Sequence, residues 1–225
     1  METRSEERRK EIEALKCRLQ NRTPMRARFR LPLTKEETEE VLLASVKANI
    51  ANRRMPFRMN DSLKRQLSEV ADWLTGASSK FGLILCGGVG NGKSTFIRAI
   101  RDIVYLLSLK DEETGQSIEL TYRDAKTILD TYSSDQRNWI SFCNAEVLAI
   151  DDLGTEPLEI QNFGNIHSPM VELLTKRYDK CLTTIISTNL TPEQIRNKYG
   201  ARISDRFNEM LMKVVFDNAS YRRGV

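Results

Sequence analysis

The chain has 225 residues, 40% of them hydrophobic and 29% charged, with a formal net charge of +4. This length suits one domain with an appendage and excludes two full enzyme domains, and no apolar run approaches the roughly 20 residues that span a bilayer. The charged start METRSEERRK lacks the apolar core of a signal sequence, so we expect a cytoplasmic protein with no membrane partner. Four cysteines and one histidine are dispersed, which favours reduced thiols over a disulfide or a zinc site.

The basic surplus of the chain is N-terminal. Residues 1–30 hold ten Lys or Arg against five Glu, which leaves 25 basic and 26 acidic residues elsewhere. Such an arm can meet nucleic acid or an acidic protein surface, and it can also be only a solvated helix.

Residues 6–20 have the pattern of a charged helix with a thin apolar stripe, and residues 21–32 have the composition of a basic linker that ends in proline. One narrow stripe buries little area, so this helix needs a partner to stay folded. We therefore expect a basic helical arm and linker at residues 1–32 and one larger domain at residues 33–225. The stripe consists of Ile12, Leu15 and Leu19.

The larger domain alternates apolar strands with helices. A capping box at Thr34 and Glu37 opens its first helix, and a second helix starts at Asp61 and stops at Gly76. Unbroken apolar runs fit strands of a parallel sheet that is covered on both faces, and strands that alternate with helices indicate an α/β fold. The predicted strands are residues 81–86, 118–123 (an edge strand), 146–150, 183–187 and 214–216. The predicted helices between them are residues 93–109, 124–133, 169–180 and 192–199.

The stretch GGVGNGKS between the first strand and the next helix matches the pattern G-x-x-x-x-G-K-[ST]. Glycines let the backbone curl so that successive N–H groups point at a phosphate, and the helix that follows adds its positive end. We expect Lys93 to reach the β and γ phosphates and Ser94 to offer its hydroxyl to Mg²⁺. The predicted cofactor-binding loop comprises Gly87, Gly88, Val89, Gly90, Asn91, Gly92, Lys93 and Ser94.

Two adjacent acids, Asp151 and Asp152, follow the apolar strand at residues 146–150. After a phosphate-binding loop, such a pair favours a metal role for Asp151, and Asp152 would orient or deprotonate the attacking water. The alternative is that the acids cap the next helix. Asn189 follows the strand at residues 183–187 and would contact the γ phosphate or position water, or be only a turn residue.

The stretches GGVGNGKST, LAIDDLGTEP and TTIISTNLTPEQIRNKYGARISDRF together resemble the AAA+ ATPases of the DnaC/IstB type. These are replicative helicase loaders and the ATP-dependent helper proteins of insertion-sequence transposition. The resemblance covers the chain from about Phe57 onward. It implies a P-loop NTPase (AAA+) three-layer sandwich with a mainly parallel five-stranded sheet, and ATP with Mg²⁺ as cofactors.

The resemblance also assigns roles to single residues. Arg206 matches the arginine finger, and Arg202 lies one turn earlier on the same face. In such families the finger enters a neighbour's site, which implies an ATP-dependent oligomer and slow hydrolysis that needs the neighbouring subunit. The resemblance implies Walker A roles for Gly87, Gly92, Lys93, Ser94 and Thr95, Walker B roles for Asp151 and Asp152, and a sensor 1 role for Asn189.

The chain departs from the family pattern at both ends. We expect at most a few residues of the usual C-terminal lid, with Arg222 as a candidate sensor 2. We also expect a short basic helix where helicase loaders carry a helicase-binding domain. The function that the resemblance implies is still that of a protein that assembles on single-stranded DNA and loads a replicative helicase. The alternatives are a helper that recruits or activates a transposase and an ATP-gated switch with negligible turnover. Arg98, Arg101 and Lys110 are candidates for salt-sensitive contact with the DNA backbone.

Overall fold

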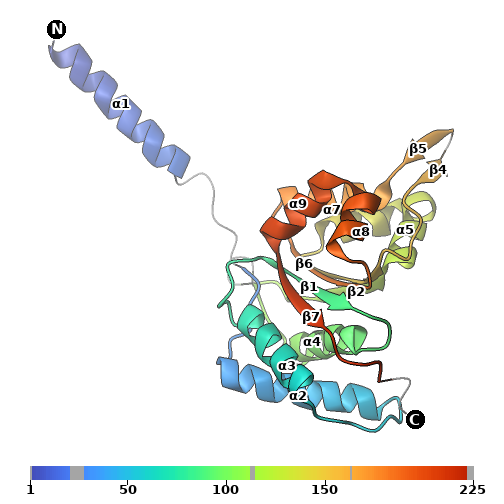
Figure 1. Cartoon of the computed structure of the whole chain (residues 1–225). Coiled ribbons are helices and arrows are strands. Elements are labelled where there is room, and N and C mark those ends of the chain that lie inside the picture. Colours follow the sequence, from blue (N-terminus) through green and yellow to red (C-terminus); the bar gives the residue numbers. More distant parts are fainter. Residues whose placement is uncertain (1, 21–27, 112–114, 163, 222–225) are drawn as a thin grey trace.

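The computed structural model describes residues 2–20, 28–111, 115–162 and 164–221 (Figure 1). Its centre is a five-stranded sheet in the order β2-β3-β6-β1-β7, in which every neighbouring pair of strands is parallel. The prediction of an α/β fold with a mainly parallel five-stranded sheet is therefore confirmed. The strands are β1 (Gly82–Gly87), β2 (Leu120–Asp124), β3 (Val147–Leu153), β6 (Thr183–Thr188) and β7 (Leu211–Phe216).

Helices cover both faces of the sheet (Figure 1). One face carries α2 (Lys35–Ala51), α3 (Asp61–Leu74) and α4 (Lys93–Leu107), and the other carries α5 (Ala125–Ser134), α6 (Gln136–Asn144), α7 (Pro169–Asp179), α8 (Pro192–Tyr199) and α9 (Ala201–Met210). Successive strand residues point to opposite faces, so Leu83 and Leu85 enter the core under α2–α4 while Ile84 enters the other core. This two-sided burial explains why the central strands read as unbroken apolar runs.

Helix α1 (Glu2–Gln20) has the predicted charged character. All of its described side chains, residues 6–19, are exposed, including the stripe at Ile12, Leu15 and Leu19. In the linker, however, Phe29 and Leu31 are buried in the domain core, and the Leu31 N–H donates to the Leu74 carbonyl at 2.8 Å. None of the described helices combines the length and the apolar character that a bilayer crossing requires.

Local chemistry explains where several helices begin. Thr34 and Glu37 form the predicted capping box of α2, and Thr191 forms a second one with Gln194 at the start of α8. Asn60 caps α3, because its Oδ1 accepts the Leu63 N–H at 2.8 Å.

Helices α6 and α9 and a short β-hairpin are not among the elements predicted from the sequence. Helix α6 follows α5 almost directly, because Asp135 ends the first helix and caps the second by accepting the Asn138 N–H at 3.1 Å. A short antiparallel hairpin joins β4 (Ile160–Asn162) to β5 (Asn165–His167). Strands of three residues have too few positions to show an alternating pattern.

A buried arginine ties α7 to the sheet. The side chain of Arg177 is 0% exposed, and its guanidinium donates to Thr184 Oγ1 at 3.0 Å. It also donates to the backbone carbonyls of Phe142, Ala145 and Thr183 at 2.9, 2.8 and 2.6 Å. The charge is compensated because several oxygens surround it, and Arg177 thereby joins the end of α6 to the start of β6.

Candidate functional site

The glycine-rich loop runs from the end of β1 to the first residue of α4, as predicted. Gly87 is required by space, because a Cβ there would lie 2.1 Å from the Phe216 carbonyl oxygen of the neighbouring strand β7. Gly92 has a φ of 105°, a conformation that side chains disfavour, and it immediately precedes α4. The loop therefore lies against β7 and presents the N-terminus of α4, where backbone N–H groups lack helical partners and attract anions.

Lys93 is at the centre of this loop and is only 5% exposed. Its Nζ donates to the carbonyls of Gly87 at 2.8 Å and Gly88 at 2.6 Å, and to Asn91 Oδ1 at 3.1 Å. It also donates to Asn189 Oδ1 at 2.7 Å. The structure thus joins the loop lysine to the asparagine after β6. A buried ammonium with four neutral oxygens within hydrogen-bond distance is well placed to exchange some of them for phosphate oxygens, which carry charge.

Asp151 accepts three hydroxyl hydrogen bonds although it is only 5% exposed. Its Oδ1 accepts from Ser94 Oγ at 2.9 Å and from Ser187 Oγ, and its Oδ2 accepts from Tyr122 Oη at 2.5 Å. Ser94 and Asp151, the two predicted metal ligands, are therefore in direct contact. A hydroxyl beside one carboxylate is a donor set of hard oxygens that fits Mg²⁺, which keeps most of its waters.

The sequence did not identify Tyr122 and Ser187 as residues of the site. Burial, followed by the hydrogen bond to Asp151, raises the pKa of Tyr122 to about 12, so the phenol stays a neutral donor near pH 7. Ser187 Oγ also accepts the backbone N–H of Asp152 at 2.9 Å. One hydroxyl therefore contacts the carboxylate of Asp151 and the backbone of Asp152. A single tyrosine or serine inside a strand carries no sequence signal for this role.

Asp152 has a strained backbone at the point where β3 meets the site. Its φ is +53°, in the left-handed region that asparagine and aspartate tolerate better than most residues. The register of β3 against β6 shifts between Ile150 and Leu153, as at a β-bulge. A bulge re-aims side chains at a strand end, and Asp152 lines the same pocket as Asn189.

This pocket has a volume of about 820 Å³. The glycine loop and Thr95 form one wall, and the end of α2 with the segment before α3 forms an apolar wall that the sequence did not reveal. The size and the mixture of apolar surface with a few polar groups are typical of small-molecule sites. The apolar wall includes Val46, Ile50, Met55, Pro56 and Leu63.

The arginines predicted to act on the phosphates, Arg202 and Arg206, lie on α9, outside this pocket. None of the described residues that line the pocket comes from α9. On that helix the guanidinium of Arg206 pairs with Asp179 at 3.0 Å and lies over the Tyr178 ring, 4.5 Å from its centroid. Arg206 is 9% exposed and its Nη1 has no partner among the described residues, whereas Arg202 is exposed. Arg222 lies outside the described residues.

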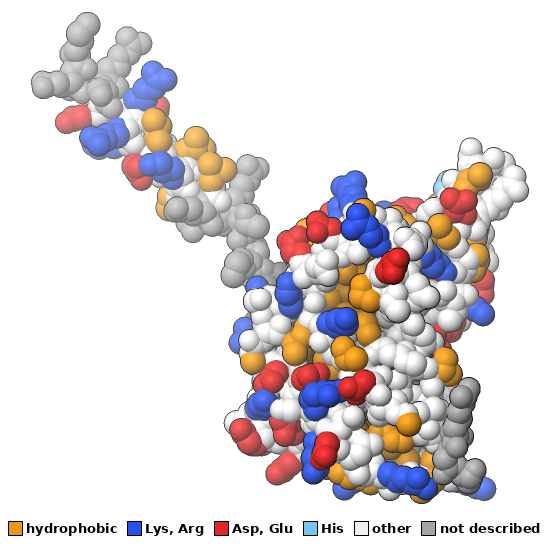
Figure 2. Space-filling model, viewed as in Figure 1, with side chains coloured by type: hydrophobic (Ala, Val, Ile, Leu, Met, Phe, Trp, Pro, Cys, Tyr) orange, Lys and Arg blue, Asp and Glu red, His pale blue; other side chains and the backbone are white. Residues whose placement is uncertain are grey.

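Two of the three candidate DNA contacts, Arg98 and Arg101 on α4, lie against an aromatic ring, and the third, Lys110, follows that helix. The guanidinium groups of Arg98 and Arg101 each lie 5.6 Å from the Tyr122 ring centroid, and Lys110 is exposed. Figure 2 shows Lys, Arg, Asp and Glu side chains interspersed over the face in view, so neither charge sign dominates it. The DNA contacts stay a prediction.

No protein-family model matches the sequence, and a comparison with curated protein sequences gives no significant match. Among solved structures, the chain is similar to the DnaC helicase loader, with 22% identity and a TM-score of 0.53 over 71% of this chain and 93% of that one. It is also similar to DnaI, with 20% identity and a TM-score of 0.50 over 78% of this chain and 92% of that one. A third likeness is to AMPPCP-bound DnaA from Aquifex aeolicus, with 14% identity and a TM-score of 0.51 over 74% and 50%. These likenesses show the fold alone: the chain shares with these proteins a parallel sheet that is covered by helices, in agreement with the α/β fold that the resemblance implies.

Proposed function

We propose that the protein binds ATP with Mg²⁺ in this pocket and hydrolyses it. The observation that carries the proposal is the direct linkage of four predicted residues from three elements. Lys93 contacts Asn189 at 2.7 Å, and Ser94 contacts Asp151 at 2.9 Å. Residues more than 50 positions apart in the sequence therefore meet at the pocket.

The chain's own groups have distinct tasks in this reaction. The N–H groups of the loop and the Lys93 ammonium bind the phosphates, and Ser94 with Asp151 would hold Mg²⁺, which supplies charge neutralisation at the phosphates. Asp152 orients the attacking water and accepts its proton, and Asn189 positions that water or the terminal phosphate.

We propose further that ATP-bound subunits assemble on single-stranded DNA and load a replicative helicase. The support is the sequence resemblance, together with a fold shared with a protein described as a helicase loader. In such an assembly Arg206 would enter the neighbouring subunit's pocket and stabilise charge on the transferred phosphate. Its present partner Asp179 is 56% exposed, whereas the Arg206 side chain is only 10% exposed, so Arg206 would have to leave its place over the Tyr178 ring to reach the neighbour.

The nucleotide proposal is tested by calorimetric titration of ATP into the protein with magnesium, followed by measurement of phosphate release. We expect the wild type to bind, and Lys93→Ala to lose binding. Asp152→Asn should keep binding and lose turnover. Equal, negligible turnover of the wild type and Asp152→Asn, with ATP still driving assembly, would show a nucleotide switch in place of a working ATPase.

The partner proposal is tested by co-purification with a hexameric replicative helicase and, separately, with a transposase, each with and without ATP. Retention of the helicase only when ATP is present supports the loader function. Retention of the transposase alone would assign the protein to transposition.

A further inference from the structure

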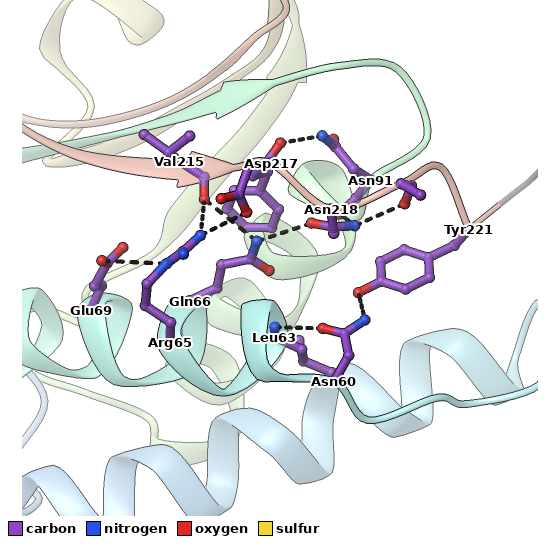
Figure 3. Close-up of polar contacts among 12 residues, drawn as sticks. Asn60, Leu63, Arg65, Gln66, Glu69, Asn91, Val215, Asp217, Asn218 and Tyr221 are labelled. Carbon is purple, nitrogen blue, oxygen red and sulfur yellow. Dashed lines mark hydrogen bonds and ion pairs between the residues drawn. The ribbon is translucent and has the colours of Figure 1, made fainter.

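The segment after β7, residues 217–221, lies across the glycine-rich loop, and we call it the strap. The Tyr221 N–H donates to the Gly90 carbonyl at 3.0 Å. Asn218 Nδ2 donates to the Asn91 carbonyl at 3.2 Å (Figure 3). The Tyr221 ring is also close to Gly92, since a Cβ built there would lie 3.6 Å from the ring. The strap therefore follows the loop along three consecutive residues.

The other side of the strap is anchored to α3 and its cap (Figure 3). Gln66 Nε2 donates to Asn218 Oδ1 at 3.0 Å, and Asn60 Nδ2 donates to Tyr221 Oη at 3.2 Å. Asn218 thus uses both ends of its amide, accepting from α3 and donating to the loop. Because each partner fixes the role of one amide end, the side chain has one satisfied orientation.

These contacts bear on the direction of the loop's backbone groups. A phosphate-binding loop works when its N–H groups point at the ligand, and in a curled loop the carbonyls then point outward. The strap supplies donors for two such carbonyls, those of Gly90 and Asn91. A peptide flip that turned the N–H groups away from the phosphates would leave these donors and carbonyls unpaired.

A second connection reaches Lys93 itself. Asn91 is 3% exposed, and its Nδ2 donates to the Phe216 carbonyl at 2.5 Å, at the point where β7 ends and the strap begins. Its Oδ1 accepts from Lys93 Nζ at 3.1 Å. The end of β7, Asn91 and the lysine therefore form one continuous chain of hydrogen bonds.

We infer that the strap positions the glycine-rich loop for polyphosphate binding, with Asn218 and Tyr221 as its positioning residues. The inference rests on the proposed nucleotide-binding function and adds residues outside the loop motif. Its ligand class is any polyphosphate, because the strap's hydrogen bonds act on the loop backbone that would bind the phosphates. A strap that served only as a wall of the base pocket would affect nucleotides and leave pyrophosphate alone.

The experiment measures the affinity of the full chain for ADP and for inorganic pyrophosphate, each with magnesium, by calorimetry or by displacement of a fluorescent ADP. Asn218→Ala removes the donor to the Asn91 carbonyl and the acceptor for Gln66, and it adds no charge near the phosphates. We expect it to weaken both ligands by the same factor, about 3- to 10-fold, the range of the one hydrogen bond lost to the loop. Tyr221→Phe removes only the hydroxyl contact with Asn60, and we expect a smaller loss, about 2- to 5-fold, again equal for both ligands.

Lys64→Ala serves as the control on α3, the helix that anchors the strap. Lys64 is 65% exposed and is paired with Asp61, so the affinities of this variant should equal those of the wild type. Thermal unfolding midpoints verify that each variant is folded, and Tyr221→Phe keeps the inference testable if Asn218→Ala is not folded. Wild-type affinity of both variants for both ligands would overturn the inference, and so would a loss confined to ADP. A wild type that binds neither ligand would instead overturn the proposed function, and the inference with it.

Discussion

Replacing Tyr122 by phenylalanine isolates one hydrogen bond of the candidate metal site. The substitution removes the hydroxyl that donates to Asp151 Oδ2 at 2.5 Å, and it keeps the ring beneath Arg98 and Arg101. The buried carboxylate then loses one of its three hydroxyl donors. Because the remaining two donors bond to Oδ1, no described hydroxyl replaces the lost one at Oδ2.

The expected cost follows from the charge of the acceptor. Hydrogen bonds to charged groups contribute about 1.5–3 kcal/mol to stability, and the half-buried position of Tyr122 puts this one at the lower end. For a chain of this size about 1 kcal/mol shifts the unfolding midpoint by about 2–4 °C. We therefore expect Tyr122→Phe to lower the free energy of unfolding by about 1.5 kcal/mol and the midpoint by about 3–6 °C.

The assay is calorimetric or spectroscopic thermal unfolding at pH 7, without nucleotide. Tyr105→Phe is the matched control, because Tyr105 is 80% exposed on α4 and the same atom is removed there; its midpoint should stay within about 1 °C of the wild type. A Tyr122→Phe midpoint that equals the control would refute the reasoning, since the phenol would then contribute nothing to holding Asp151.

Three further predictions follow from contacts described above. Arg177→Met should lower the free energy of unfolding by about 3 kcal/mol or more, measured by urea denaturation, because it leaves several buried oxygens without their donor; an unchanged midpoint would contradict this. Arg206→Ala should keep ATP binding and lose hydrolysis and assembly, whereas Asp179→Asn, which releases Arg206 from its ion pair, should strengthen ATP-dependent assembly in analytical ultracentrifugation. Full activity of Arg206→Ala would show that each subunit completes its own site. Deletion of residues 1–20, which spares the buried Phe29, should weaken DNA or partner binding while ATP affinity stays at the wild-type level; DNA binding that does not change across a salt titration would speak against a charged arm.

The sequence predicted those parts of the fold whose signals are local. The glycine-rich loop needs glycine at Gly87 and Gly92 for reasons of space and φ, and these positions are visible as a motif. The capping box at Thr34 and the unbroken apolar strands likewise follow from short-range chemistry. For the same reason, the places of Lys93 and Asp151 could be deduced from the motifs that contain them.

The parts that the sequence did not reveal depend on contacts between distant segments. Tyr122 reaches Asp151 only because β2 pairs with β3 in the register that puts Tyr122 opposite Ala149. Ser187 acts on both acids because β6 is the other neighbour of β3. Arg177 reads as a surface residue of an amphipathic helix, and only the arrangement of α6, α7 and β6 shows that it is buried.

The position of β7 has a consequence for protein synthesis. This strand is the last of the described strands along the sequence, yet it pairs with β1 directly beside the glycine-rich loop, and its final carbonyl, that of Phe216, accepts from Asn91. A nascent or prematurely terminated polypeptide that stops before Leu211 therefore carries every motif residue of the loop and lacks the strand that packs beside it. We expect fragments of this kind to lack the ordered loop that the proposed phosphate site requires.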